Sequence, residues 1–560
     1  MNTKTTIIIG GVAGGATVAA RLSRLTNQRR IILIERGAHV SFANCGLPYY
    51  IGNIIEEQSK LLLANPEMFR NRFGVDVRLR HEATAIDKTN KTVTVRNLDT
   101  DSSETLSYDE LVLSPGAAPF RPNMPGIDLP GVLTLRNIPD AERIKARIRE
   151  TNAQSALIIG AGFIGLEVAE NLRHLGLNIS VIEGADHILP PLDSQMAPYV
   201  SQLLEKNGIS VHTRTLTSGI RRTESGRLQA YNDNWQSDET DLIILSIGVR
   251  PESTLAREAG LQLGINGSII VDETMRTSEP GIWAVGDAVQ VTSGVTGKPM
   301  LLALAGVAQK QARVAAADIA GTPKETFKHV WGTSVLRIFG TTVALTGMNR
   351  DNLNRAGLQG SYEYIDLHPA NHVTYYPGAS PIHIRLVYEK GSGRILGATA
   401  IGQQDVARRI DTIAMSMSMG GTVQDLAAAE LCYSPQEGAA KDPVNMAGMA
   451  ATNNILGLHP VAHYEDIAAH PEAQLIDVRE ESEVARAPYP GARNIPLSQL
   501  LRRMNELDPA KPVLVMCQVG VRGYTATRHL LNAGYQARNL SGGYTTLNLI
   551  RQHCDTAREQ

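Results

Sequence analysis

The chain has 560 residues, of which 54 are Lys or Arg and 56 are Asp or Glu, so the formal net charge is −2. This balance excludes the one-signed field that nucleic acid or an anionic membrane would attract, and a small-molecule partner is expected instead. The length requires several domains. Because no apolar run could span a bilayer and the apolar start is interrupted by glycine, we expect a cytoplasmic protein.

The four cysteines are widely scattered, at Cys45, Cys432, Cys517 and Cys554. Their spacing fits neither a disulfide framework nor a metal site. We therefore predict reduced thiols with separate roles, and no metal. Cys432 is expected to pack against its neighbours.

The first predicted elements form a dinucleotide-binding βαβ unit. A buried strand at 5–9 precedes the glycine loop GGVAGG, a helix, and a second strand that ends at Glu35. Glycines permit the tight turn and the close approach of a pyrophosphate to the helix N-terminus. Val12 replaces one expected glycine. The candidate cofactor-binding residues of this unit are Gly10, Gly14, Gly15, Glu35 and Arg36.

A second strand, glycine loop and helix follow in ALIIGAGFIGLEVAENLRHLG. Gly160, Gly162 and Gly165 satisfy the G-x-G-x-x-G pattern, and the next strand ends at Glu183. A carboxylate at this position binds ribose hydroxyls and repels a 2′-phosphate, so NADH is predicted over NADPH.

The remaining elements indicate two further structural blocks. A strand near 277–289 ends at Gly286 and Asp287. From about 326, alternating apolar strands and a helix near 404–420 predict an α+β domain. After AATNNILGLHP the pattern restarts as strand, helix, strand and helix, which predicts a compact α/β tail.

The two glycine loops, together with LVLSPGAAP, LSIGVRP and PGIWAVGD, resemble the flavoprotein disulfide reductases over residues 1 to 450. This resemblance implies FAD and NADH as cofactors and a homodimer. It also implies that Gly286 and Asp287 contact FAD, with Asp287 on the flavin ribitol.

Cys45 lies in SFANCGLPYYIG, without the second nearby cysteine that most of these reductases carry. A lone thiol beside a redox cofactor must receive its second sulfur from elsewhere. Pro48 suits the first turn of a helix that begins just after Cys45, and the helix dipole is expected to lower the pKa of the thiol.

The Cys45 segment resembles that of the coenzyme A-disulfide reductase branch, and HVTYYPGASP and CYSPQEGAAKDPVNMAG resemble its C-terminal signatures. By this resemblance Cys45 is the redox thiol, and Tyr375 and Tyr433 reach it from the partner subunit. The resemblance further implies coenzyme A as substrate or cofactor, with contacts from Thr17, Arg24, Ser41, Asn44 and Lys441.

The tail resembles a rhodanese domain at LIDVRE, GARNIP and CQVGVRG. Cys517 and Arg522 bracket a loop whose amides could surround a sulfur at the start of the next helix. Phosphatases of this design have one more residue between Cys and Arg, so the shorter loop favours sulfur. Asp477 and Arg479 are expected to stabilise the fold. An inert rhodanese used for docking is the alternative.

The predicted fold class is α/β: two Rossmann-like nucleotide-binding domains, with the FAD domain interrupted by the NAD domain, an α+β dimerisation domain and a C-terminal α/β rhodanese domain. The FAD-binding domain is predicted to comprise two segments, 1–115 and 271–325, on either side of the NADH-binding domain at 116–270. The dimerisation domain is predicted at 326–450, a linker at 451–460 and the rhodanese domain at 461–560.

These features together predict an FAD-dependent NADH reductase of persulfide, polysulfide or coenzyme A-disulfide substrates, whose rhodanese handles sulfane sulfur and releases sulfide. One alternative is an NADH oxidase or peroxidase that cycles Cys45 through sulfenic acid. Another is a redox-sensing sulfur carrier. The sequence leaves open the natural sulfur substrate, the role of coenzyme A, and whether sulfur passes between Cys517 and Cys45.

Overall fold

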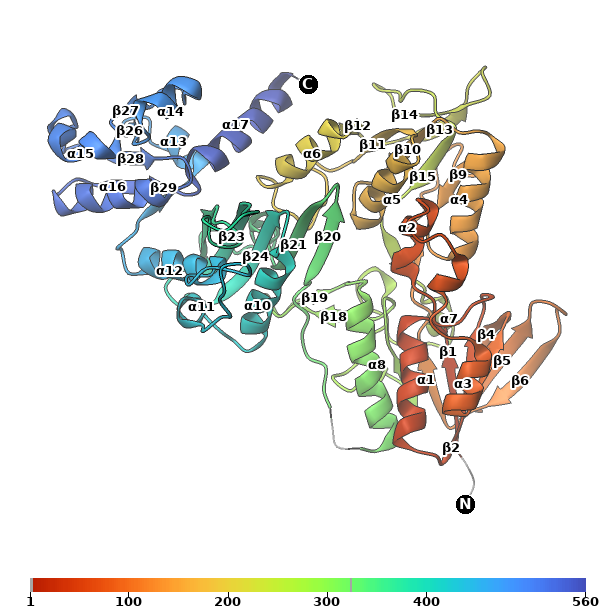
Figure 1. The fold of residues 1–560 in the computed structure, drawn as a ribbon. Coiled ribbons are helices and arrows are strands. Elements are labelled where there is room, and N and C mark those ends of the chain that lie inside the picture. The colour runs from red at the N-terminus through yellow and green to blue at the C-terminus, as the bar shows by residue number, and fades with distance from the viewer. Residues whose placement is uncertain (1–3, 323–324, 560) are drawn as a thin grey trace. The chain divides into compact units, whose positions relative to one another are not determined.

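The structure is a computed structural model that describes the backbone of residues 4–322 and 325–559 and the side chains as far as residue 551. The chain divides into two compact units, one of Met1–Gly184 and Gly208–Val330, the other of Ala185–Asn207 and Trp331–Gln560 (Figure 1). Residues 185–207, which lie inside the segment predicted as the NADH domain, pack with the second unit.

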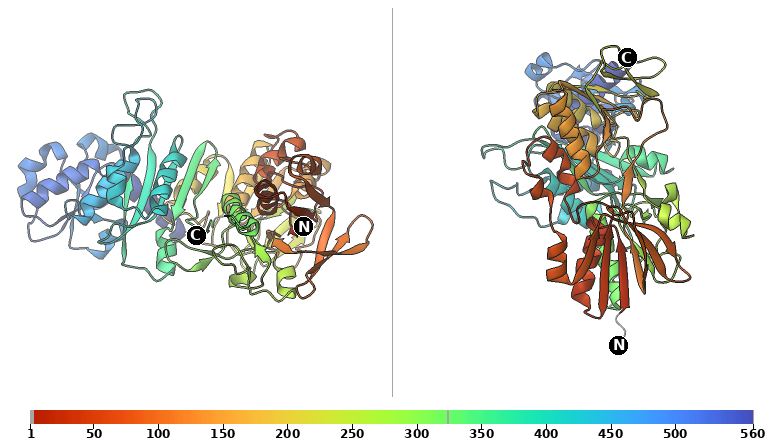
Figure 2. Two further views of the ribbon diagram at one scale, coloured as in Figure 1. Left: turned by 90° about the horizontal axis from the view of Figure 1, so that it is seen from below. Right: turned by 90° about the vertical axis from the view of Figure 1, so that its right-hand side faces the viewer.

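The first unit contains a parallel sheet in the order β17-β7-β1-β2-β3 (Figure 2, right). Its strands are Lys4–Ile9 (β1), Arg29–Glu35 (β2), Val75–Leu79 (β3), Glu110–Leu113 (β7) and Ile282–Ala284 (β17). The strands read as runs of Ile, Leu and Val because parallel strands are covered on both faces. On one face, helices Ala13–Leu25 (α1) and Ala305–Ala320 (α8) pack side by side (Figure 1).

A second parallel sheet in this unit has the order β12-β11-β10-β15-β9. Its strands are Val132–Thr134 (β9), Ser155–Ile159 (β10), Asn178–Ile182 (β11), Ile209–His212 (β12) and Leu242–Leu245 (β15), with helices Ile138–Glu150 (α4) and Phe163–His174 (α5). The two Rossmann-like sheets that the sequence predicted are therefore confirmed.

The first unit also contains smaller elements between the strands of these sheets. They are a three-stranded antiparallel sheet of His81–Asp87 (β4), Thr92–Asn97 (β5) and Ser103–Ser107 (β6); the pairs Ala117–Pro119 (β8) with Val249–Pro251 (β16), Gly219–Arg222 (β13) with Leu228–Tyr231 (β14), and Val291–Thr292 (β18) with Pro299–Met300 (β19); and helices Leu47–Ile51 (α2), Pro66–Phe73 (α3) and Thr254–Glu258 (α7).

The second unit begins with an antiparallel sheet in the order β20-β21-β24-β23-β22. Its strands are Ser334–Ile338 (β20), Thr341–Gly347 (β21), Tyr362–Leu367 (β22), Ile382–Glu389 (β23) and Ile395–Gly402 (β24). The helices of this part of the unit are Ala197–Lys206 (α6), Arg350–Arg355 (α9), Val406–Ser418 (α10), Val423–Ala428 (α11) and Pro443–Ile455 (α12). This matches the predicted α+β block.

The tail of the second unit is a parallel sheet in the order β25-β29-β28-β26-β27. Its strands are Val461–Ala462 (β25), Gln474–Asp477 (β26), Arg493–Asn494 (β27), Val513–Met516 (β28) and Ala537–Leu540 (β29). The helices of the tail are Tyr464–Ala469 (α13), Glu481–Arg486 (α14), Leu497–Arg503 (α15), Val521–Asn532 (α16) and Gly543–Glu559 (α17). The predicted α/β tail is thus confirmed.

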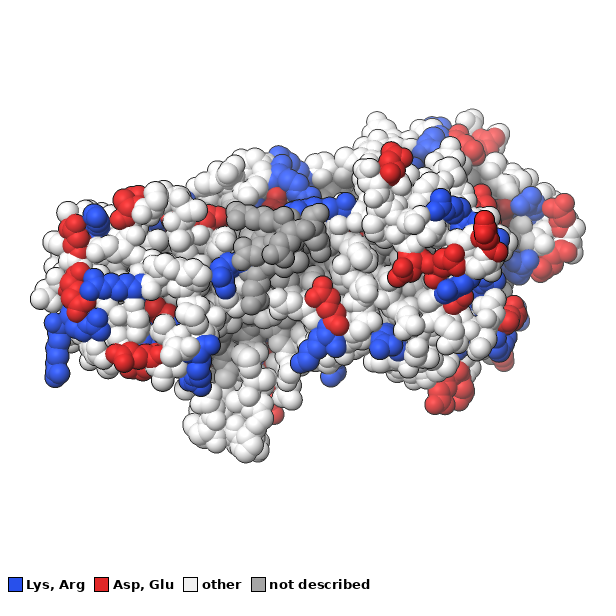
Figure 3. All heavy atoms as spheres, turned by 90° about the horizontal axis from the view of Figure 1, so that it is seen from above, with Lys and Arg blue, Asp and Glu red and all other residues white. Residues whose placement is uncertain are grey.

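On the face drawn in Figure 3, basic and acidic side chains are interspersed. Within the described residues, no helix is long and apolar enough to cross a membrane. The same residues contain no group of three or more His, Cys, Asp or Glu side chains that could hold a metal ion.

A buried ionic network joins the parts of the second unit. The Arg385 guanidinium donates to Asp366 at 2.9 and 2.8 Å and to Asp193 at 2.7 Å, and all three side chains are almost fully buried. The backbone N–H of Asp366 donates to the Ser541 hydroxyl at 2.7 Å. The network thus links the antiparallel sheet to the tail and to the segment 185–207.

The acidic partners in this network remain ionised. Burial alone would raise the pKa of Asp366, but Arg385 and His383 outweigh burial and hold it well below its usual range. A lowered pKa stabilises the fold above the unfolded-state value of about 4, and this contribution is lost as the pH falls below it.

Arg385→Ala is expected to lower the free energy of unfolding of the second unit by about 3–5 kcal/mol, because Asp193 and Asp366 stay buried without their partner. Chemical denaturation followed by circular dichroism measures this change. The matched control is Arg337→Ala, which removes an exposed arginine from β20 of the same sheet and should cost less than about 0.5 kcal/mol. Equal losses in the two variants would contradict the assignment.

Candidate functional site

The first glycine loop follows β1 and has no room for side chains. Gly10 has φ of +95°, and a Cβ on it would collide with the Ser114 carbonyl oxygen. A Cβ on Gly15 would collide with the carbonyl oxygen of Gly10, and one on Gly14 would lie 2.6 Å from the Ser114 hydroxyl. The close packing of loop, helix and strand therefore requires glycine at these positions.

The carboxylate of Glu35 lies at the end of β2 and is held by backbone amides. It accepts hydrogen bonds from the N–H groups of Gly11 at 2.7 Å and Gly37 at 2.6 Å. Arg36 instead pairs with Glu82 at 3.5 Å and is largely exposed. Glu35 is thus aimed into the glycine loop, and Arg36 is directed towards the antiparallel sheet.

The second glycine loop, after β10, repeats this arrangement. Gly160 has φ of +103°, and a Cβ on Gly160 or Gly165 would collide with a backbone carbonyl oxygen. Glu183, directly after β11, accepts a hydrogen bond from the N–H of Ala161 at 2.8 Å. Gly162 has open space around it, as an approach by a ligand requires. Both loops therefore present a strand-end carboxylate beside a glycine turn.

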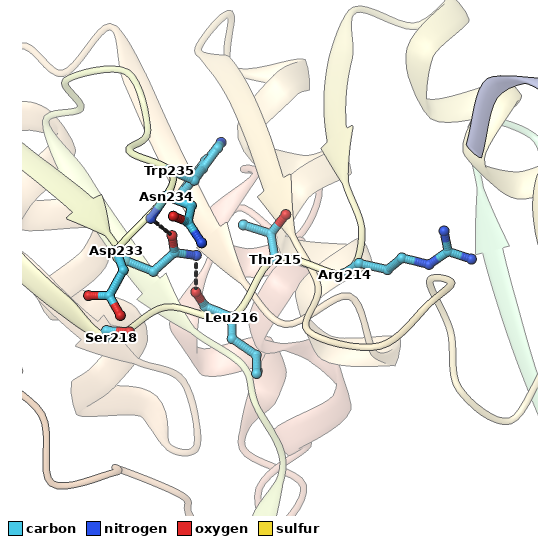
Figure 4. Close-up of a pocket in the computed structure, with 8 residues that line it drawn as sticks. Arg214, Thr215, Leu216, Ser218, Asp233, Asn234 and Trp235 are labelled. Carbon is cyan, nitrogen blue, oxygen red and sulfur yellow. Dashed lines mark hydrogen bonds between the residues drawn. The ribbon is translucent and has the colours of Figure 1, made fainter. Parts of the chain in front are cut away.

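A pocket of about 300 Å³ borders the strand that ends at Glu183 (Figure 4). The backbone N–H of Thr215, in its wall, donates to the Glu183 carbonyl oxygen at 2.9 Å. Figure 4 shows Thr215, Asn234 and Trp235 around the pocket, while the Arg214 side chain extends away from it. No sequence motif marked this pocket, because its walls come from two separate turns.

The segment after β17 meets the first glycine loop at one edge of the first sheet. Ile9 and Ala284 are both in register with Leu113, so the residues after each strand emerge together. Gly286 has φ of +88°, and its N–H donates to the buried side chain of Gln311 at 2.7 Å. Sequence reasoning missed Gln311, which lies in α8 outside any motif.

Asp287 follows in this segment and is half-buried. Burial raises the pKa of its carboxyl group, and the positive charge of Arg136 offsets only part of this rise. The predicted residues Gly286 and Asp287 therefore lie at the same sheet edge as the first glycine loop.

Cys45 lies in a turn of 3-10 helix, Asn44–Gly46, directly before α2. Its backbone N–H is bonded to the Asn44 side chain at 3.1 Å, and its side chain is accessible to solvent. Desolvation by the surrounding protein raises the pKa of the thiol, and the negative charges of Glu167 and Asp287 raise it further. The expected lowering was wrong, because desolvation and the two carboxylates raise the pKa of the thiol, and α2 has only five residues.

Glu167 connects this thiol to the second glycine loop. It lies in α5, two residues after Gly165, and accepts a hydrogen bond from the Tyr49 hydroxyl at 3.3 Å. Burial raises the pKa of Glu167 to about 7. The charges of Glu167, behind the second glycine loop, and of Asp287, beside the first, therefore both act on Cys45. The sequence contained no signal that Glu167 would act on Cys45.

The residues implied for coenzyme A lie in both units. In the first unit, the Thr17 hydroxyl donates to Ala13 at 2.7 Å, Arg24 lies over the Phe73 ring at 5.7 Å, and Asn44 adjoins Cys45. Ser41 adopts a φ of +50° and donates its N–H to Gly11 at 2.7 Å. Lys441 is exposed on the second unit.

Tyr375 and Tyr433 come together on the second unit. Their hydroxyl oxygens are 3.1 Å apart, and this hydrogen bond raises the pKa of Tyr375. Their side chains are 73% and 48% exposed, which is unusual for aromatic residues. Cys432 is also exposed, so the expectation that it packs was wrong. The fourth cysteine, Cys554, lies outside the described side chains.

Cys517 lies at the end of β28 and is almost fully buried. Its sulfur accepts a hydrogen bond from the N–H of Gly520 at 3.1 Å, and its carbonyl oxygen accepts one from the N–H of Tyr544 at 2.7 Å. The loop therefore directs an amide at the sulfur, as predicted. Arg522 donates to both oxygens of Glu483, at 2.6 and 2.7 Å.

Asp477 and Arg479 form a buried pair with contacts of 3.1, 3.0 and 2.7 Å. A pair that is closed off in this way holds the backbone around the tail sheet rather than reacting with a substrate. This geometry agrees with their predicted role in stabilising the fold, which stays a prediction.

Three family models match consecutive stretches of this chain. Residues 4–312 match pyridine nucleotide-disulphide oxidoreductase, residues 335–442 match the dimerisation domain of that family, and residues 461–548 match the rhodanese-like domain. The predicted fold class is therefore confirmed, from the two nucleotide-binding domains to the rhodanese domain.

Relatives agree with these matches. A coenzyme A disulfide reductase of Staphylococcus epidermidis is 35% identical over 449 residues, which are 80% of this chain and 99% of the relative. Among solved structures, reduced Bacillus anthracis CoADR-RHD is 40% identical with a TM-score of 0.95 and covers 99% of each chain. An NAD-dependent persulfide reductase from A. fulgidus is 35% identical with a TM-score of 0.90 and covers 97% of this chain and 99% of its own.

The first family model spans more than half of the chain, and the relatives align over nearly their whole length. The sequence and the geometry of both glycine loops agree with this match. The chain therefore belongs to the pyridine nucleotide-disulphide oxidoreductase family.

Proposed function

We propose that this protein is an FAD-dependent NADH reductase of persulfide, polysulfide or coenzyme A-disulfide substrates. One observation carries the proposal: Cys45 is an accessible thiol without a second cysteine in its segment, and the charges of Glu167, behind the second glycine loop, and Asp287, beside the first, act on it. The relatives named as coenzyme A disulfide and persulfide reductases support this chemistry.

The proposed cofactor sites follow from the two loops. FAD fits the first loop, because Gly10, Gly14 and Gly15 allow the tight turn between strand and helix that such a loop needs, and the carboxylate of Glu35 can receive ribose hydroxyls. Gly286 and Asp287 lie at the same edge, and Arg36 is the outermost proposed contact. NADH fits the second loop through Gly160, Gly162, Gly165 and Glu183, with the pocket of Thr215 and Trp235 beside it.

The proposed reaction is a thiol–disulfide exchange on Cys45. The thiolate attacks one sulfur of R–S–S–R′, the substrate S–S bond breaks, the mixed disulfide Cys45–S–S–R forms, and R′–S⁻ leaves and takes up a proton. For a persulfide R–S–SH, attack on the inner sulfur forms the same mixed disulfide and releases HS⁻. Bound FAD would supply the two electrons from NADH that break this disulfide, which returns Cys45 to its thiolate and releases R–S⁻.

The other proposed contacts complete the site in a homodimer. The dimerisation domain supports the dimer, and we propose that Tyr375 and Tyr433 face Cys45 of the partner subunit, which would explain their exposure. Coenzyme A is the proposed ligand of Thr17, Arg24, Ser41, Asn44 and Lys441. We also propose that the domains have the boundaries predicted from the sequence and that the protein is cytoplasmic.

The fused rhodanese has a proposed role in this reaction. Cys517, with the Gly520 N–H on its sulfur, is proposed to carry a persulfide, with Arg522 at the end of its loop. Covalent fusion raises the effective concentration of this sulfur near its acceptor if the geometry allows contact. The NADH oxidase alternative has weaker support, because the Lactobacillus brevis water-forming enzyme is 26% identical and covers 81% of this chain.

Cys45→Ser is expected to reduce NADH consumption with glutathione persulfide by more than roughly 100-fold under anaerobic conditions, while FAD stays bound, because the attacking sulfur is lost. Stopped-flow absorbance of NADH measures this. Cys432→Ser is the control, since it removes another exposed thiol. Rapid NADH consumption with oxygen alone would support the oxidase, and negligible turnover with every sulfur substrate would support the carrier.

Glu167→Gln is expected to shift the pH dependence of Cys45 alkylation by iodoacetamide to lower pH, because one of the charges that raise the thiol pKa is removed. At pH 8 the rate should increase by roughly 2- to 10-fold, since one pKa unit changes the thiolate fraction tenfold. Mass spectrometry of the Cys45 peptide follows the reaction. Glu150→Gln, at the exposed end of α4, is the control, and equal shifts would contradict the interpretation.

Glu183→Gln is expected to lower the KM for NADPH by about tenfold relative to that for NADH, because a carboxylate at this strand end repels a 2′-phosphate. Steady-state kinetics with both nucleotides measure the ratio. Glu224→Gln, in the exposed turn between β13 and β14, provides the control. If the ratio stays constant in Glu183→Gln, this residue does not select the nucleotide.

A further inference from the structure

We propose that the Cys517 loop accepts sulfur from organic persulfides and rejects thiosulfate. Two features support this: Glu483 already pairs with Arg522, the arginine of the loop, and the side chains of Val519 and Val521 make the edge of the loop apolar. This inference rests on the proposed role of Cys517 as a sulfur carrier and adds the class of sulfur donor. Thiosulfate is a dianion whose sulfonate group needs a free cation when it leaves water.

The loop itself carries one cation. In CQVGVR, residues 517–522, Arg522 is the only basic side chain, and Arg479, which donates to Gln518 of the loop at 3.3 Å, is buried and paired with Asp477. Its two terminal nitrogens donate to the two carboxylate oxygens of Glu483 at 2.6 and 2.7 Å. A bidentate pair uses the donor edge that would otherwise hold a sulfonate, so an incoming dianion must compete with a carboxylate already in place.

Glu483 is itself held in position from two sides. It is the third residue of α14, where its carboxylate also accepts the N–H of Glu480 at 3.0 Å in a capping box. The hydrogen bond from Arg522 lowers the pKa of Glu483 to about 2. The carboxylate therefore stays ionised, and keeps its hold on Arg522, throughout the physiological pH range.

The surroundings of the loop also disfavour a dianion. Val521 is 57% exposed and Val519 is half-buried, so the outward side chains between Cys517 and Arg522 include two apolar ones. The charges of Cys517 and Glu480 act on Arg522 in addition to its hydrogen bond with Glu483. A persulfide R–S–SH brings an apolar carbon beside its sulfurs and requires no second cation.

The two donors differ in what must leave. With an organic persulfide, the Cys517 thiolate attacks the outer sulfur, the S–S bond of the donor breaks, and the products are Cys517–S–S⁻ and R–SH after transfer of the persulfide proton. With thiosulfate, the same attack would break the bond between the sulfane sulfur and the sulfonate and release sulfite. Each reaction moves one sulfur atom and uses no external oxidant or reductant.

The test uses the full-length FAD-bound protein with cyanide as the acceptor, which takes the outer sulfur of Cys517–S–S⁻ as thiocyanate. Glutathione persulfide and thiosulfate are compared as donors after subtraction of the uncatalysed rates. Glu483→Gln keeps the capping box, since glutamine serves at that position, but releases Arg522. We expect kcat/KM for thiosulfate to rise at least tenfold and that for glutathione persulfide to change less than threefold.

Val521→Lys is an independent variant, because it adds a cation at the exposed rim without touching Glu483. It should also raise kcat/KM for thiosulfate at least tenfold. Glu481→Gln removes a neighbouring carboxylate of α14 that bonds Gln499 at 3.5 Å, and it should leave both donors unchanged. If Glu483→Gln fails to fold, as judged by its melting temperature, Val521→Lys decides the question.

Two results would overturn the inference: wild-type protein that uses thiosulfate as efficiently as glutathione persulfide, or no thiosulfate gain in the folded variants. Failure of the proposed sulfur-carrier role gives a different result. In that case Cys517→Ser and the wild type would transfer sulfur from glutathione persulfide at the same rate.

Discussion

The position of the three chemically important loops follows from one constraint, the convergence of parallel strands at their carboxyl ends. The glycine loops follow β1 and β10, and the Cys517 loop follows β28, and each of these is the middle strand of a five-stranded sheet. A middle strand is covered on both faces and paired on both sides, so the loop after it is anchored by neighbours. Helices α1, α5 and α16 then begin with amides free to receive a ligand.

The two sulfur sites have different surroundings. Cys517 is buried, and the Gly520 N–H donates to its sulfur. Cys45 is accessible and lies near the carboxylates Glu167 and Asp287, which oppose a negative charge. An accessible thiol is open to an incoming disulfide or persulfide, whereas a buried sulfur that accepts an amide hydrogen bond is shielded from solvent.

The structure also shows where local sequence patterns stop being informative. Glycine spacing predicted both nucleotide loops, because a turn that excludes Cβ atoms requires glycines at fixed positions within six residues. The approach of Glu167 to Cys45, the bond from Gly286 to Gln311, and the pair of Arg522 with Glu483 join residues that are far apart along the chain. The pKa of Cys45 is raised and not lowered, because Glu167 and Asp287, which add to desolvation, lie far from its segment in the sequence.

Local patterns in the chain predicted the fold class, the order of the domains and both glycine loops, which the structure and the family matches confirm, whereas the roles of Cys45 and Cys517 stay proposals. Each of these depends on residues close together in the chain, whose backbone geometry is set by local sterics and hydrogen bonding. The charges around each sulfur, and the buried network of Arg385 that joins three segments of the second unit, became visible only in the folded chain. Electrostatics acts through space, so its sign at a given atom depends on which distant side chains the fold brings near.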